Sequence, residues 1–235
     1  MSRTMTARGR AKDAIAAQAA ILDAAEAAFA DHGFAGARID AIAEASGYNK
    51  SLIFHYFDDK LGLYTAVLRR ADQQGKYLHS YLLDLIDSDA AVTATTFREF
   101  VGQLVGATFD YFLAHPRLVR ILAWEEAAGW ATMQEVASEL DLDDVAQYTA
   151  FLERAQRVGA LRPNVTLPFI LHVMVNFCRN YLTSLSLFQL IAPAKDPARS
   201  EGFASAREQI VSFIVHGLTV DPPSQAPDSE VSPVH

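Results

Sequence analysis

Cysteine is scarce in this sequence: Cys178 is the single one among 235 residues. A single thiol excludes a disulfide framework within the chain and agrees with a reducing compartment. A secretory signal is also lacking, because the basic residues 1–12 are followed by alanine-rich sequence and not by an apolar h-region. These absences predict a cytoplasmic protein.

Uninterrupted apolar runs of membrane-spanning length are lacking as well. The longest apolar stretch, residues 167–191, approaches the roughly 20 residues that a span needs. Arg179 and the polar residues His172, Asn176 and Asn180 interrupt it, and a charge inside a bilayer is costly. We therefore predict a helix buried in protein and no membrane partner.

Acidic residues are absent from one stretch, although the whole chain has a net charge of −8. Residues 45–57 contain no Asp or Glu. Residues 1–60 contain seven Lys and Arg against eight Asp and Glu, whereas the rest of the chain contains 13 against 20. An acidic body with a neutral-to-basic face is typical of a protein that contacts DNA at one end.

Recognisable catalytic patterns are missing too. There is no glycine-rich phosphate loop, no Gly-x-Ser-x-Gly and no nucleophile–base arrangement, and His172, Cys178 and His216 do not have metal-ligand spacing. We expect no catalytic residue, no metal and no cofactor. A helical-bundle enzyme or scaffold with a vestigial DNA-binding motif remains the alternative, because convergent active sites leave little trace in a sequence.

Residues 33–60, in contrast, carry a clear pattern. Ile39, Ile42 and Ala43 recur at helical spacing, and Gly47 then supplies the residue that enters a left-handed turn most readily. Asn49 follows and is expected to cap a second helix through its side-chain oxygen. Two short helices joined by a glycine turn predict a helix-turn-helix, whose second helix enters the major groove of DNA.

The second short helix is expected to have two different sides. Its buried side contains Ile53, Phe54 and Phe57, and its outer side contains Lys50, Ser51, Leu52, His55 and Tyr56. Asp59 is then expected to cap a third helix that starts at Lys60.

An alanine-rich helix is predicted ahead of this motif, from residue 12 to 32, and Gly33 should end it. Its apolar stripe is expected to contain Ile15, Ala19, Leu22, Ala25 and Phe29. Residues 1–11 resemble a flexible basic arm. Such an arm is either a leader without a role or a source of extra phosphate or minor-groove contacts, and the sequence leaves both open.

Beyond residue 60 the apolar residues recur at helical spacing, and no run alternates as a strand would. The predicted fold is all-α. A three-helix DNA-binding unit at residues 12–60 precedes a second helical domain at residues 61–220. Residues 221–235 contain too few apolar side chains to form a core and are expected to form a disordered tail.

Residues 21–63 resemble the TetR-type one-component transcriptional regulators. The resemblance is carried by Ile21, Leu22, Ala24, Ala25, Phe29, Gly33, Ile42, Ala43, Gly47, the run Phe54-His55-Tyr56-Phe57, Lys60 and Leu63. One position departs from the family pattern, because Arg38 stands where Thr or Ser is usual. The change removes a helix cap and a hydroxyl contact to phosphate, and it leaves Gly36 as a weaker cap.

The resemblance implies that residues 61–220 form a helical ligand-binding and dimerisation domain. It implies a homodimer, in which the last two long helices of each subunit form a four-helix interface. It also implies a ligand-responsive regulator, most often a repressor, that binds operator DNA and is released by a small effector. A monomer with a central apolar helix is the alternative, but a lone reading helix contacts too little DNA for specific binding.

The expected DNA contacts are Arg38, Asn49, Lys50, Ser51, Leu52, His55, Tyr56 and Lys60. Lys60 and Tyr56 are expected on phosphate, since free N–H groups at the start of a helix attract anions. Lys50 suits guanine O6 and N7. His55 suits either a phosphate or a base, and Leu52 either a thymine methyl group or the edge of the core.

The expected effector is small and apolar or amphipathic, because aromatic side chains with a few polar neighbours are typical of ligand cavities. The candidate ligand-binding residues are Phe109, Phe112, Trp124, Tyr148, Phe151, His172, Asn176 and Phe177. For any one aromatic residue, plain core packing is the alternative.

Overall fold

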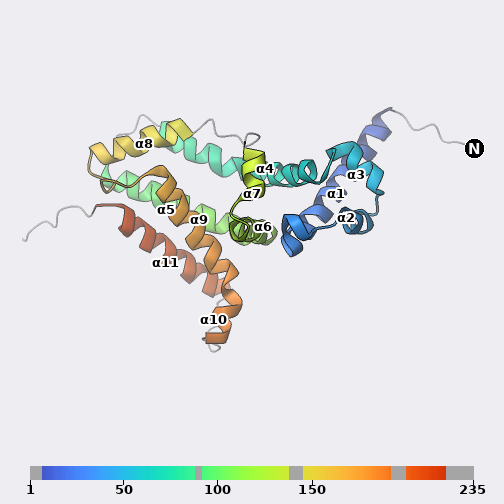
Figure 1. The fold of residues 1–235 in the computed structure, drawn as a ribbon. Helices are drawn as coiled ribbons and strands as arrows, with labels where there is room; N and C mark the ends of the chain where they lie inside the picture. The colour runs from blue at the N-terminus through green and yellow to red at the C-terminus, as the bar shows by residue number, and fades with distance from the viewer. Residues whose placement is uncertain (1–6, 88–91, 138–144, 192–199, 221–235) are drawn as a thin grey trace, which may run out of the picture. The chain divides into compact units, whose positions relative to one another are not determined.

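The structure is a computed structural model that describes residues 7–87, 92–137, 145–191 and 200–220. Within these ranges the chain is helical and contains no strand, apart from an isolated bridge between Leu161 and Thr219. The all-α prediction is therefore confirmed. The helices, shown in Figure 1, are α1 (Ala7–Gly36), α2 (Ile39–Ser46), α3 (Lys50–Phe57), α4 (Lys60–Asp87), α5 (Ala94–Ala114), α6 (Pro116–Ala127), α7 (Ala131–Val136), α8 (Val145–Arg157), α9 (Leu167–Thr183), α10 (Leu185–Ile191) and α11 (Ser200–Leu218).

Two parts of the sequence prediction lie outside the described residues. These are the first six residues of the expected basic arm and the expected tail from residue 221. Residues 7–11, which were also assigned to the arm, belong to α1. None of the described helices is long and apolar enough to cross a bilayer.

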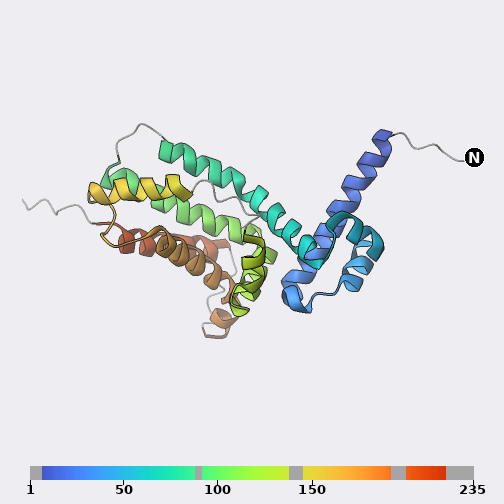
Figure 2. The same ribbon diagram turned by 45° about the horizontal axis from the view of Figure 1, so that its top comes forward.

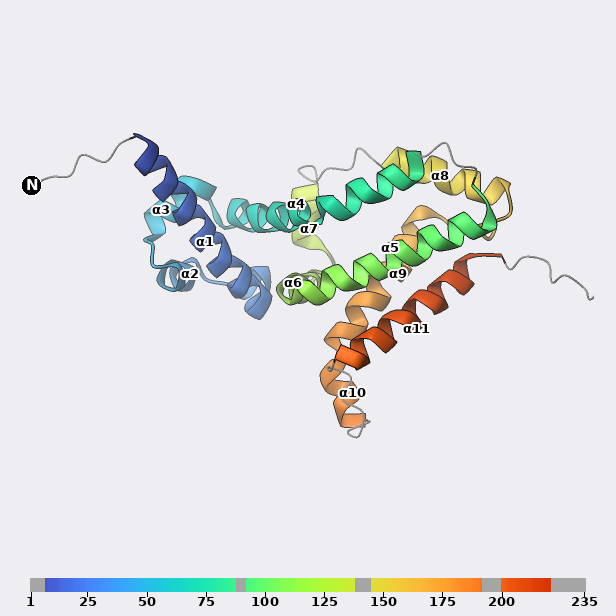
Figure 3. The same cartoon turned by 180° about the vertical axis from the view of Figure 1, so that it is seen from behind.

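The chain divides into two compact units. The first contains residues 1–81, 110–143 and 179–186, and the second contains the remaining segments. α4 is a single helix from Lys60 to Asp87 (Figure 3). Each unit has its own buried side chains.

The first unit has a core built around α1, α2, α3 and the start of α4. Its buried members come from all four helices and from Ala37 between α1 and α2, with one residue each from α6 and α7: Ile21, Ala25, Phe29, Ala30, Ala37, Ile42, Ile53, Phe57, Leu63, Tyr64, Val67, Leu68, Ile121 and Val136. Aromatic rings fill its centre, with Tyr64 edge-on to Phe29 at 4.9 Å between centroids. Burial of these apolar side chains fixes the short helices α2 and α3, which are too short to be stable alone.

The register of α1 differs from the predicted stripe. Ala25 and Phe29 are buried as expected, but Ile15 and Ala19 are exposed, and Ile21 replaces Leu22 in the core. The buried residues Ala17, Ile21, Ala25 and Phe29 are spaced by four along one side of the helix. The prediction was therefore correct for the C-terminal half of this stripe and wrong for the N-terminal half.

Gly33 interrupts α1 and does not end it. Its φ of 66° and ψ of 177° are not helical, yet one further turn follows up to Gly36. A Cβ at this position would lie 3.1 Å from the ring of Trp124, so both the backbone angle and the neighbouring ring require glycine here.

The second unit is centred on α5, which contacts α8, α9 and α11 (Figures 1 and 2). Phe151 of α8 packs edge-on against Phe100 at 4.7 Å between centroids. The hydroxyl group of Thr108 on α5 lies 3.5 Å from the sulfur of Met174 on α9. Gly102 faces valine side chains of α11, which an added Cβ would meet at an ordinary contact distance of 3.6 Å.

Residues 167–190 were expected to form one helix, surrounded either by core on all sides or by a second subunit on one side. The stretch is interrupted at Ser184 and forms α9 and α10. In the single chain it is not buried on every side: Phe169 and Phe177 of α9 are exposed, and so are Leu187 and Leu190 of α10. Phe177 stacks on Phe213 of α11 at 5.3 Å between centroids, and the two rings remain 42% and 64% exposed.

Candidate nucleic-acid interface

The helix-turn-helix has the local geometry that its sequence predicts. Gly47 ends α2 in the left-handed conformation, with φ 75° and ψ 14°. The side-chain oxygen of Asn49 accepts a hydrogen bond of 2.8 Å from the N–H of Leu52. Both capping predictions are confirmed. Ile42 of α2 and Ile53 of α3 are fully buried, so the two helices are held by the core on one side.

The outer side of α3 presents polar groups. Lys50, Ser51 and His55 are exposed, whereas Leu52 and Tyr56 are half-buried. Phe54, which was predicted on the buried side, is exposed, because its position lies about 100° around the helix from Ile53. The available groups are therefore an ammonium, a hydroxyl and an imidazole, with one aliphatic and two aromatic side chains beside them.

Arg38 occupies the N-cap position of α2. Its backbone is extended, with φ −116° and ψ 129°, and its side chain makes no capping hydrogen bond. Gly36 was expected to act as the replacement cap, and that expectation is wrong because Gly36 belongs to the last turn of α1. The first turn of α2 consequently has free N–H groups beside an exposed guanidinium, which suits an anion.

Lys60 begins α4, as predicted, and its ammonium group is held in place. Its Nζ donates a hydrogen bond of 3.3 Å to the carbonyl oxygen of Ala35 and lies 4.8 Å from the centroid of the Phe34 ring. Partial burial lowers the pKa of this ammonium group. Lys60 therefore fastens the end of α1 to the start of α4, and an ammonium has three donors, so one contact leaves others for a phosphate.

A tight turn connects α3 to α4. Asp58 has φ 63° and ψ −60°, and the N–H of Asp59 donates to the carbonyl oxygen of Phe57 at 2.7 Å, which is the pattern of a γ-turn. The carboxylate of Asp59 accepts from the N–H of Gly62 at 2.7 Å, which confirms the predicted cap. A Cβ on Gly62 would lie only 2.1 Å from the Phe57 oxygen. These contacts fix the direction of α3 relative to α4.

A buried carboxylate supports the same unit from α6. Glu125 is 2% exposed and accepts hydrogen bonds from the Tyr64 hydroxyl at 2.7 Å and from the N–H of Met133 at 3.0 Å. Burial, together with the charge and hydrogen bond of Glu125, raises the pKa of Tyr64. The neighbouring Trp124 donates its indole N–H to the carbonyl oxygen of Ala30 at 3.2 Å. α6 is thus tied to α1, α4 and α7.

Ion pairs add to these ties. Arg70 of α4 pairs with Asp23 and Glu26 of α1, and Arg120 of α6 pairs with Asp31 of α1 at 3.0 Å. Arg179 is buried and pairs with Glu126. A buried charge needs such a partner, so Glu126 compensates the cost of burying this guanidinium.

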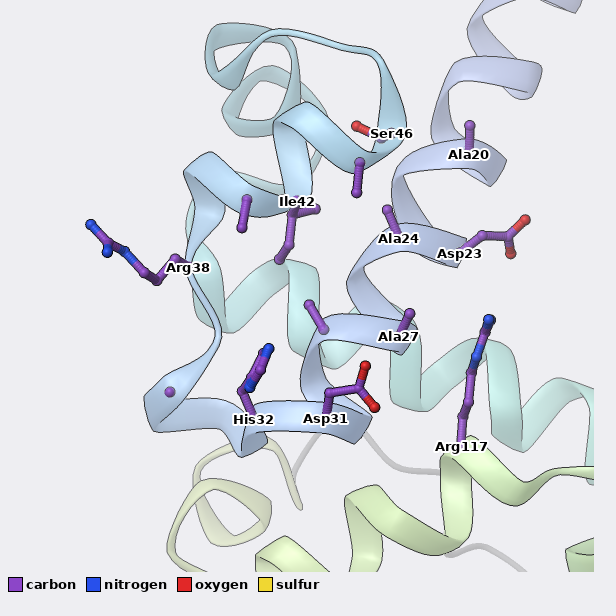
Figure 4. Close-up of a pocket in the computed structure, with 14 residues that line it drawn as sticks. Ala20, Asp23, Ala24, Ala27, Asp31, His32, Arg38, Ile42, Ser46 and Arg117 are labelled. Atoms are coloured by element: carbon purple, nitrogen blue, oxygen red, sulfur yellow. The ribbon is translucent and has the colours of Figure 1, made fainter.

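A groove of about 900 Å³ lies between α1 and α2, with one further side chain, Arg117, from α6. Alanines of both helices form its walls, and Figure 4 shows His32, Asp31 and Arg117 rising from one end of it. Arg38 is at the rim and projects away from α1 (Figure 4). Of the expected DNA contacts only Arg38 lines this groove, and none of the expected ligand-binding residues does.

The expected ligand-binding residues are distributed over both units. Phe112 and Trp124 belong to the first, and the other six belong to the second. Phe109, Phe112 and Phe151 are buried, and Tyr148 is half-buried. His172 is exposed and lies 3.1 Å from the amide nitrogen of Asn176, one turn further along α9. Their role in ligand binding stays a prediction.

Two contacts near the interface were not predicted from the sequence. One is the buried pair Tyr64–Glu125, because adjacent acids on a helix gave no sign that one of them faces the core. The other is an ion pair between Lys50 and Asp40 at 2.9 Å. An acid in the first turn of α2 was visible in the sequence, but its distance from Lys50 depends on how α2 and α3 pack.

Comparison with known proteins agrees with this architecture. Residues 21–67 match the family described as bacterial regulatory proteins, tetR family, and residues 98–214 match the tetracyclin repressor-like C-terminal domain. The chain is 32% identical over 166 residues to the HTH-type transcriptional repressor SCO4008 of Streptomyces coelicolor, covering 70% of this chain and 78% of that protein. It is 27% identical over 198 residues to the HTH-type transcriptional repressor NicS of Pseudomonas putida, covering 82% and 89%.

A solved structure shares the fold. It is a TetR family transcription regulator from Marinobacter aquaeolei VT8, with a TM-score of 0.63, 19% identity, and coverage of 90% of this chain and 100% of that one. The helix-turn-helix and these relatives define a DNA-binding transcriptional regulator and not an enzyme. The chain belongs to the TetR family.

Proposed function

We propose that this protein is a repressor that binds a palindromic operator as a homodimer and leaves it when a small effector binds. Residues 12–60 contact DNA in this proposal, and residues 61–220 bind the effector and the second subunit. The protein acts in the cytoplasm, where operator DNA is accessible. The observation that carries the proposal is the outer side of α3, an acid-free helix that presents Lys50, Ser51 and His55.

The contacts divide into two kinds. Tyr56, Lys60 and Arg38 act on phosphates. Tyr56 lies at the end of α3 and Lys60 at the start of α4, and Arg38 lies beside the free N–H groups of α2. Lys50 and Leu52 act on base edges from the first turn of α3, with Asn49 and Ser51 beside them and His55 one turn further on.

The experiment is selection of bound sequences from a random DNA pool with the full chain. Two inverted half-sites, with centres one or more helical turns of about 34–36 Å apart, support the proposal. Lys60→Ala should weaken binding to all sequences alike and lower the salt dependence, whereas Lys50→Ala should change the preference at one base pair per half-site. A single asymmetric site bound by a monomer would contradict the proposal.

The exposed aromatic face of α9 and α11 supports the homodimer. Phe177 and Phe213 stack on each other and Phe169 is exposed as well, so an apolar patch lies open on the single chain. Monomeric proteins rarely leave such patches uncovered. A second copy of the same two helices is complementary to this face by two-fold symmetry.

Release by an effector is supported by the aromatic content of the C-terminal half, in which aromatic side chains have polar neighbours such as His172 and Asn176. An effector lowers DNA affinity only if it binds the non-binding conformation more tightly. The test is a screen of apolar and amphipathic compounds for a rise in melting temperature combined with loss of operator binding. Asn176→Trp should abolish the response and keep DNA binding. A variant that still responds would remove Asn176 from the proposed site.

A further inference from the structure

An ion pair joins the two helices of the DNA-binding motif on their solvent side. The ammonium of Lys50, the first residue of α3, lies 2.9 Å from a carboxylate oxygen of Asp40, the second residue of α2. Both side chains remain accessible, at 50% for Lys50 and 67% for Asp40. An acidic side chain of α2 therefore reaches the start of α3, although α3 and the five residues before it, residues 45–57, contain no acid.

Local stability explains only part of this arrangement. An acid in the first turn of α2 is favoured by the free N–H groups there, since Arg38 makes no side-chain cap. A lysine in the first turn of α3 is disfavoured by the dipole of α3 itself, and the negative charge of Asp40 offsets this unfavourable interaction. An exposed pair of this kind contributes only about 0–1 kcal/mol to folding. That is too little to hold α2 against α3, which the buried Ile42 and Ile53 already do.

The chemistry of lysine shows what such a partner changes. Its ammonium is a point charge on a flexible four-carbon stem with three donors that rotate freely. Beside DNA an unrestrained lysine is attracted to the nearest phosphates, which give affinity without sequence information. A lysine that already donates to Asp40 has two donors left and carries a compensated charge.

Two remaining donors match one base in particular. Guanine offers two adjacent acceptors in the major groove, O6 and N7, whereas adenine offers N7 beside an amino donor, and thymine offers O4 beside a methyl group. We propose that Asp40 is a positioning residue that restricts Lys50 to guanine. This inference rests on the proposed function, in which α3 enters the major groove.

A compensated charge also has a consequence for non-specific binding. Each phosphate neutralised by a cation adds about 0.9 to the slope of log affinity against log salt concentration. When Lys50 is paired with Asp40, it adds little to that slope. When Lys50 is released from Asp40, it can neutralise about one phosphate per subunit and so increase the slope. Asp40 therefore raises discrimination and lowers affinity for DNA of random sequence.

The test uses the full chain and sequence selection from a random DNA pool, followed by affinity measurements at several salt concentrations. Asp40→Asn keeps an oxygen near the start of α2 but removes the charge. It should lower the preference for guanine at one base pair per half-site by about tenfold, which corresponds to one lost base contact. It should also tighten binding to random DNA and steepen the salt slope.

Two further variants separate this role from simple repulsion between Asp40 and DNA. Glu44→Gln removes an exposed acid from the same helix and should change the affinity for all sequences alike, with the base preference intact. In a Lys50→Ala background, Asp40→Asn should leave the base preference unchanged, because Asp40 acts through Lys50. Urea unfolding of each variant verifies that α2 is retained.

Three results would overturn the inference. If the Asp40→Asn protein matches the Glu44→Gln protein in base preference, in affinity for random DNA and in salt slope, Asp40 acts only by repelling DNA. A change of base preference that persists in the Lys50→Ala background would make Asp40 itself the base-reading group. A wild-type protein that selects no sequence would overturn the proposed function, and this inference with it, whereas the first two results leave that function standing.

Discussion

Glu125 illustrates how one side chain couples segments that are far apart in the sequence. Both of its carboxylate oxygens have donors, the Tyr64 hydroxyl from α4 and the Met133 N–H from α7. With 2% exposure, water cannot readily replace either donor. The start of α4 is therefore attached to α6 by a contact whose loss leaves one buried carboxylate oxygen without a donor.

Tyr64→Phe should lower the free energy of unfolding by about 1–3 kcal/mol, because one oxygen of a buried carboxylate loses its donor. Urea unfolding in the absence of DNA measures the change. Tyr48→Phe is the matched control, since no hydrogen bond of its hydroxyl is recorded within the described residues, and it should change stability by less than about 0.5 kcal/mol. Equal stability of Tyr64→Phe and wild type would mean that the pair does not stabilise the fold.

Gly62→Ala should destabilise the turn between α3 and α4 by about 1–3 kcal/mol, because the new Cβ meets the Phe57 oxygen at 2.1 Å. The displaced α3 should also bind operator DNA more weakly. Thermal unfolding and a gel shift measure the two effects. Gly102→Ala in α5 is the control with the opposite expectation, since its Cβ finds ordinary contact at 3.6 Å and alanine favours the helix by about 0.5–1 kcal/mol.

At the scale of helices, the sequence predicts those features that depend on near neighbours. The caps at Asn49 and Asp59 and the turn at Gly47 involve residues three or four positions apart, so the pattern alone identifies them. Gly33, where α1 is interrupted, lies against the ring of Trp124, which is distant in the chain. No local pattern contains that contact.

Local sequence pattern is limited in the same way for the DNA-binding residues. The outer side of α3 follows from helical periodicity, and the eight expected DNA contacts follow from local pattern and family resemblance. The pairing of Lys50 with Asp40 depends on the packing angle between α2 and α3, which periodicity does not contain. The aromatic residues of the C-terminal half carry still less information, because the same residue types build cores and ligand cavities.

The uncapped start of α2 gives a prediction at this scale. Arg38→Ser should stabilise the protein by about 0.5–2 kcal/mol, because serine supplies the missing acceptor for the first N–H groups. If Arg38 contacts phosphate, the same variant should lower the salt slope of DNA binding. Arg38→Ala is the control, since it removes the charge without adding a cap. A serine variant less stable than the alanine variant would contradict this account of α2.

For the whole molecule, the exposed rings of α9 and α11 predict assembly. Phe213→Glu places a charge in the proposed interface and should convert a dimer into a monomer in light scattering. Operator affinity should then fall by on the order of 10²-fold or more, because two half-sites are no longer bound together. Val158→Glu, at an equally apolar and exposed position after α8, should leave the dimer intact. A Phe213→Glu protein that remains dimeric would place the interface elsewhere.

The position of Trp124 beside the interruption in α1 has a spectroscopic consequence. The chain has two tryptophans, Trp124 and Trp130, and they flank Glu125 on α6 and at the start of α7. The indole of Trp124 contacts Gly33 and donates to Ala30, so its emission depends on the contact between α6 and α1. A Trp130→Phe protein would retain Trp124 as its single tryptophan, which can be excited selectively over tyrosine. Its emission maximum would then report, without any added label, whether operator DNA or an effector changes the environment of α1.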